Sequence, residues 1–159
     1  MVLFSNKQEA NLRVCIQMVE DAITALGHVP DDSRIDGVDD LPAWKVHKGT
    51  ADVYVQLGIN GESNVLRVTA PVLHLAAGVD APRLFRRLLE LNATKVAGAA
   101  FGLRDDHVVL VAERTTVDLD PSEVVDIIKR VEDFADHYDD VLVTEFGGRR
   151  AGPSSAPVT

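Results

Sequence analysis

The sequence predicts an α+β domain in which an antiparallel five-stranded sheet packs against helices, in the order α-β-β-β-α-β-β-α. Apolar residues recur at three- and four-residue spacing in three segments, as in amphipathic helices. In five other segments they occupy every second position or form short runs, as in strands. The strands are grouped rather than separated singly by helices, which favours antiparallel pairing.

The first predicted helix begins at Ser5, which forms a capping-box pattern with Gln8. It ends at Gly27, because glycine readily adopts the left-handed conformation of helix ends. An apolar stripe runs between these ends: Leu12, Ile16, Val19, Ile23 and Leu26. The helix is therefore an amphipathic cover for another part of the fold.

Three strands are expected next. A short extended segment at 44–48 is followed by residues 51–59, which alternate apolar and polar side chains as a half-buried strand does. Asn60-Gly61 is a strong hairpin signal, because both turn positions must tolerate positive φ. The returning strand covers 66–72, and Pro71 limits its pairing near the end.

Asp80 and Pro82 predict the start of a second helix, as the N-cap and a first-turn proline. Asn92 is its expected C-terminal cap. The helix has a wide apolar surface: Leu84, Phe85, Leu88, Leu89 and Leu91.

A second hairpin is predicted from strands at 96–103 and 107–113, with the turn at Asp105-Asp106. Both faces of this hairpin carry apolar side chains, Val109 and Val111 on one of them. A sheet with one face in water should alternate apolar and polar residues. The second face must therefore be covered by a helix of the same chain, a second subunit or a client.

The third predicted helix begins with a cap, a first-turn proline and a capping-box acid at Asp120, Pro121 and Glu123. Its inner stripe extends to Tyr138, and a short apolar segment follows at 141–143. We expect one domain at residues 1–146 and a disordered C-terminal tail at 147–159, which is rich in Pro, Ser, Ala and Gly.

The formal net charge of -9 disfavours direct binding to nucleic acid or to anionic membranes. It favours a basic protein partner, although acidity can equally serve solubility alone. The sequence shows no secretory signal and no apolar stretch long enough to span a membrane. These features predict a cytoplasmic protein.

The sequence offers no recognisable set of nucleophile, base and charge stabiliser, and no phosphate loop, so we expect no enzymatic activity. The lone Cys15 is expected to be buried and inert. Asp133 and His137 could share a helix face, but two ligands are too few for a zinc site, and a solvated acidic face is the better interpretation. No cofactor or metal is predicted.

The run Leu88-Leu89-Glu90-Leu91-Asn92, the small-residue strand, the acidic turn and the Asp-Pro start of the last helix resemble the YbjN family. Those proteins are similar in fold to type III secretion chaperones. The resemblance covers residues 5–138. It implies a non-catalytic, usually dimeric protein that holds clients along exposed apolar grooves or strand edges, with Leu88, Leu89, Leu91 and Asn92 in structural roles.

We therefore expect a homodimeric, chaperone-like or adaptor domain that binds an unidentified protein partner. The candidate dimer or partner surface consists of the apolar residues in apparent excess: Leu84, Phe85, Leu88, Leu91, Phe101, Val109 and Val111. The alternative is a regulatory domain that binds a small ligand between sheet and helices. Tyr54, Gln56 and His74 are its candidate polar groups, although their positions are more simply solvent-facing.

Overall fold

The computed structural model describes residues 2–60 and 63–151. Helices and strands follow one another in the predicted grouping, with short additional elements. In chain order they are α1 (Val2–Ala25), α2 (Pro30–Ser33), β1 (Arg34–Ile35), the 3-10 turn η1 (Val38–Asp40), β2 (Ala43–Lys48), β3 (Ala51–Asn60), β4 (Ser63–His74), α3 (Ala81–Thr94), β5 (Ala100–Arg104), β6 (His107–Thr115), α4 (Pro121–Phe146) and β7 (Arg149–Arg150).

The strands form one antiparallel sheet in the order β1-β2-β3-β4-β6-β5, and β7 pairs with β4 beyond the end of β3. The α+β class and the antiparallel sheet are confirmed. The prediction of five strands is wrong, because the described residues form a sheet of seven. β2 to β6 are the predicted strands. β1 and β7 have two residues each, which is too short for any alternation to appear in the sequence.

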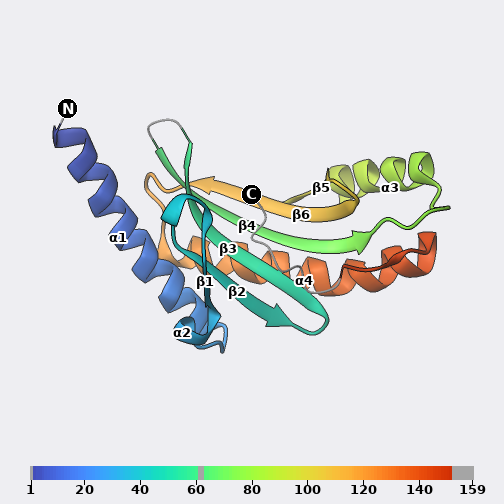
Figure 1. Ribbon diagram of the computed structural model, residues 1–159, viewed down its shortest axis with the longest axis horizontal. Helices are drawn as coiled ribbons and strands as arrows, with labels where there is room; N and C mark the ends of the chain where they lie inside the picture. Colours follow the sequence, from blue (N-terminus) through green and yellow to red (C-terminus); the bar gives the residue numbers. More distant parts are fainter. Residues whose placement is uncertain (1, 61–62, 152–159) are drawn as a thin grey trace.

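One face of the sheet carries the core. α4 lies across β2, β3, β4 and β6 on this face, and α1 packs against α4. Figure 1 shows α1 at one end of the molecule and α3 at the other, with α4 between them along the sheet. The apolar core residues on this face include Val53, Val55, Leu66, Val68, Ala70, Val108 and Leu110. Residues between them, such as Tyr54, Thr69 and Val109, are also buried, so both faces of the central strands are covered within the chain.

Two residues of the β2–β3 turn bond to α4, and the glycine between them permits the close approach. The Lys48 ammonium pairs with Asp133, and the Thr50 backbone N–H donates to Asp136 Oδ1 at 3.2 Å. Gly49 has a φ of 56°, and a Cβ there would lie 1.9 Å from Asp136 Oδ1. Glycine at this position therefore permits both the turn conformation and the close approach of the helix.

Two helix boundaries differ from prediction. α1 begins at Val2, so Ser5 lies within the helix and does not cap it. α4 continues past Tyr138, the last residue of the predicted inner stripe, through the short apolar segment at 141–143 to Phe146. Leu142 is fully buried in that last part of the helix. Its packing against the core accounts for the additional turns.

The predicted tail is ordered in part. Residues 147–151 continue the fold, because β7 pairs with the end of β4 and the Ala151 N–H donates to the Val72 carbonyl at 3.4 Å. The prediction of disorder is wrong for these five residues, and 152–159 lie outside the described residues. The hairpin at Asn60-Gly61 is present, with Asn60 opposite Ser63, while Gly61 itself lies outside the described residues.

Candidate functional site

The inner side of α3 belongs to the core. Leu84, Leu88 and Leu91, three of the seven predicted surface residues, are buried in the same apolar cluster as Phe101 of β5. The helix is also tied to the end of α4, where Arg87 Nε lies 3.3 Å from Glu145 Oε2 and the Arg83 guanidinium stacks over the Phe146 ring at 5.0 Å. These contacts position α3 firmly at one end of the sheet.

The outer side of α3 carries a second apolar stripe. Phe85 is half-buried, Leu89 is 69% exposed and Ala93 is exposed. Their four-residue spacing places them on one face of the helix. Leu103 of β5 is a further exposed apolar residue, 49% accessible. We call Phe85, Leu89 and Ala93 the outer α3 stripe.

Asn92 connects α3 to the free edge of β5. Its side-chain amide donates to the Phe101 carbonyl at 3.1 Å, and its oxygen accepts from the Phe101 N–H at 2.7 Å. The helix continues past Asn92 to Thr94, so Asn92 does not cap it. The two bonds imitate strand pairing and satisfy part of an edge that would otherwise present unpaired backbone groups. Sequence spacing gave no signal for this contact.

Val109 and Val111 lie on the face of β6 opposite α4. Val109 is buried and Val111 is half-buried. Their cross-strand neighbours on β4 are Pro71 and Thr69. Val109, Thr69 and Pro71 are buried within the chain itself, so of these four residues only the half-buried Val111 offers apolar surface on this part of the second face.

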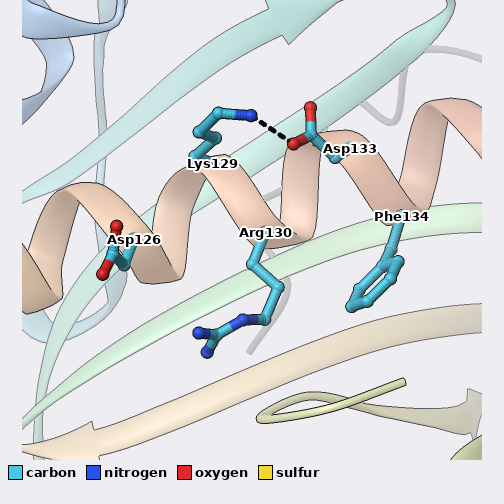
Figure 2. Close-up of a pocket in the computed structure, with 5 residues that line it drawn as sticks. All are labelled: Asp126, Lys129, Arg130, Asp133 and Phe134. Carbon is cyan, nitrogen blue, oxygen red and sulfur yellow. Dashed lines mark hydrogen bonds and ion pairs between the residues drawn. The ribbon is translucent and has the colours of Figure 1, made fainter. Parts of the chain in front are cut away.

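Two adjoining hollows lie beside α4 and share Asp126 and Arg130. Their volumes are about 360 and 290 Å3. Figure 2 shows Arg130 and Phe134 extending from α4 toward the strands, while Lys129 turns the other way and pairs with Asp133. We call this surface the α4-flank groove and define it by Gly98, Ala112, Ile127, Arg130 and Phe134.

Most of the side chains that line the two hollows are charged, and most of these are paired within the chain. Arg114 pairs with Glu123 at 3.3 Å, whereas Arg130 and Asp126 form no hydrogen bond or ion pair within the described residues. Gly98, with a φ of 71°, leaves room for the Arg130 guanidinium, since a Cβ there would lie 2.4 Å from Arg130 Nη1. A polar groove with an apolar contact at Phe134 suits a peptide that combines apolar and polar side chains.

Cys15 and Asp133, the two residues considered for a reactive thiol and a metal site, lie in surroundings that favour structural roles. Burial raises the pKa of the Cys15 thiol, which leaves it protonated and unreactive. Hydrogen bonds from Lys129 and Lys48 lower the pKa of Asp133, so this carboxylate is engaged in ion pairs. Within residues 2–60 and 63–151, no group of three or more His, Cys, Asp or Glu side chains could hold a metal.

The three candidate polar groups for a small ligand are less exposed than expected. Tyr54 and Gln56 are buried, and His74 is half-buried, so the expectation of solvent-facing side chains is wrong for the first two. The hollows beside α4 contain none of the three.

The described residues thus form an antiparallel sheet with helices on one face, and exposed apolar residues lie at the α3 end. Residues 14–154 match the family described as "T3SS (YopN, CesT) and YbjN peptide-binding chaperone 1". The chain belongs to this family of peptide-binding chaperones. The predicted resemblance and the absence of enzymatic function are confirmed.

Two solved structures share the fold. A chain of the ExsC–ExsE complex is 16% identical with a TM-score of 0.57, and the match covers 82% of this chain and 94% of that one. A chain of the HopA1–SchA chaperone–effector complex is 12% identical with a TM-score of 0.56, covering 83% and 97%. No curated protein matches the sequence. In the described part of the chain, no helix is long and apolar enough to cross a membrane.

Proposed function

We propose that this protein is a homodimeric chaperone that holds an extended segment of a client protein in the α4-flank groove. The observation that carries the proposal is apolar surface outside a core that is already complete. Exposed apolar residues gathered into a patch mark an interaction site, whereas scattered ones need no explanation. Here Phe85, Leu89 and Ala93 gather on the outer α3 stripe, and the half-buried Phe134 of α4 lies among charged side chains.

The outer α3 stripe is the proposed dimer contact. A self-complementary helix face suits a two-fold interface, because each residue meets the same patch of the second subunit. Leu89, at the centre of the stripe, would be covered by this contact. The remaining predicted surface residues of α3 already serve the core, so we propose Phe85 and Leu89 as the interface residues.

The α4-flank groove is the proposed client site. Phe134 and Ile127 offer apolar contact, and Arg130 offers an unused fork of hydrogen-bond donors for a carboxylate or a backbone carbonyl. The net charge of -9 would speed encounters with basic clients, while the groove itself selects for local shape.

A photoreactive amino acid at position 134 tests the client site. In the native cell it should form adducts with another protein, because the Phe134 side chain points into the groove. The matched control is position 144, which is exposed near the end of the same helix and outside the two hollows. Equal adducts at both positions, or none at 134, would contradict the proposed site.

A further inference from the structure

Four basic residues stand in register across four neighbouring strands. Arg104 of β5 lies opposite His107 of β6, His107 opposite His74 of β4, and His74 opposite Arg149 of β7. Residues in register on adjacent strands point to the same face of the sheet. Strands lie about 4.8 Å apart, so the four positions span about 15 Å. We call them the cationic row.

The cationic row contains polar atoms that are buried without a partner. Arg104 Nη1 and His74 Nδ1 have no hydrogen-bond partner, and the His74 and His107 rings meet edge to face at 4.7 Å. Burial and the nearby Arg67 lower the pKa of Arg104, and burial and His74 lower that of His107. The nearby Asp105 offsets part of this effect for Arg104, as do Asp105 and Asp106 for His107, and a bound anion in direct contact would offset more of the cost of desolvation.

The face that bears the cationic row also holds an unsatisfied hydroxyl. Thr69 is 0% exposed, and its Oγ1 has no hydrogen-bond partner. It lies on β4 between the row and Arg67, next to the apolar Val111. Arg67 itself pairs with Glu113 at 2.7 Å. Asp105 and Asp106 in the adjacent turn are exposed and form no ion pair with the row.

We propose that the cationic row binds an acidic segment of the client, with its carboxylates on Arg104 and the two histidines and an apolar side chain on the half-buried Val111. The inference rests on the proposed client-binding function and adds the chemistry of the client. Arg104 and Arg149 give the row two formal positive charges, in a chain whose formal net charge is -9 with histidine counted as neutral. Arginine suits this role because its planar fork matches a carboxylate.

Two synthetic peptides test the proposal on the full chain. One alternates valine and glutamate, and the other has glutamine in place of each glutamate. Fluorescence anisotropy at low salt should show about tenfold tighter binding of the glutamate peptide, the scale of one or two charge-assisted hydrogen bonds. Arg104→Gln should remove most of this preference, and Arg104→Lys should restore part of it.

Arg86→Gln is the matched control, since Arg86 is exposed on α3 and pairs with Glu90 at 3.4 Å. It should leave the glutamate preference intact. An equal affinity for both peptides, no binding of either, or an unchanged preference in Arg104→Gln would overturn the inference. Millimolar inorganic phosphate that reproduces the peptide's NMR shifts at His74 and His107 would assign the row to a free anion instead. The adducts at position 134 report on the α4-flank groove separately.

Discussion

The polar side chains at the α1 end and at the α3 end of the molecule differ in how far they are hydrogen-bonded within the chain. At the α1 end, Asn11, Asn64 and Thr116 bond to one another: Thr116 Oγ1 donates to Asn11 Oδ1 at 2.6 Å, and Asn64 Nδ2 donates to the same oxygen at 3.0 Å. At the α3 end, Leu89 and Leu103 are exposed, and Arg104 Nη1 is buried without a hydrogen-bond partner.

This difference indicates which residues stabilise the fold and which are available to bind a second molecule. At the α1 end the hydrogen bonds among Asn11, Asn64 and Thr116 specify how α1 meets the sheet. The α3 end leaves apolar area and donors that a second molecule can use. Substitutions at the first end should therefore change stability, and exposed residues at the second should change association.

The largest expected effect distinguishes the two sides of α3. Leu84→Ala should lower the free energy of unfolding by about 2–5 kcal/mol, because it leaves a cavity in the core. Leu89→Ala should change it by less than about 0.5 kcal/mol when measured on the monomer, as exposed positions do. Urea unfolding at dilution that yields monomer measures both. Similar losses in the two variants would contradict the division of α3 into inner and outer sides.

A smaller effect is expected at the α1 end. Thr116→Val keeps the side-chain shape but removes the hydroxyl between Asn11 and Asn64. It should cost about 1–3 kcal/mol, since it leaves buried polar groups unsatisfied. Val117→Thr is a control at a neighbouring exposed position and should have little effect. A neutral Thr116→Val would show that the polar cluster does not fasten α1.

The sequence predicted the parts of the fold that depend on local pattern. The alternation at 51–59, the capping box at Asp120 and Glu123, and the inner stripe of α4 all appear where expected. Element ends were less accurate, because packing of Leu142 extends α4 and pairing with β4 orders β7.

The candidate surface could be predicted only in part. The apolar excess of α3 was visible in the sequence, but periodicity could not tell that Leu84, Leu88 and Leu91 pack inward while Leu89 stays outside. The α4-flank groove and the cationic row join residues distant in sequence. The row even requires β7, whose two residues gave no strand signal.

Light scattering on the Leu89→Asp variant tests the central claim most directly. The native protein at micromolar concentration should give twice the monomer mass, and Leu89→Asp should give the monomer mass with an unchanged circular dichroism spectrum. Ile59→Asp is the matched control, because Ile59 is 56% exposed and lies on β3, away from α3. It should remain dimeric. A native protein that is monomeric, or a Leu89→Asp variant that stays dimeric, would contradict the account.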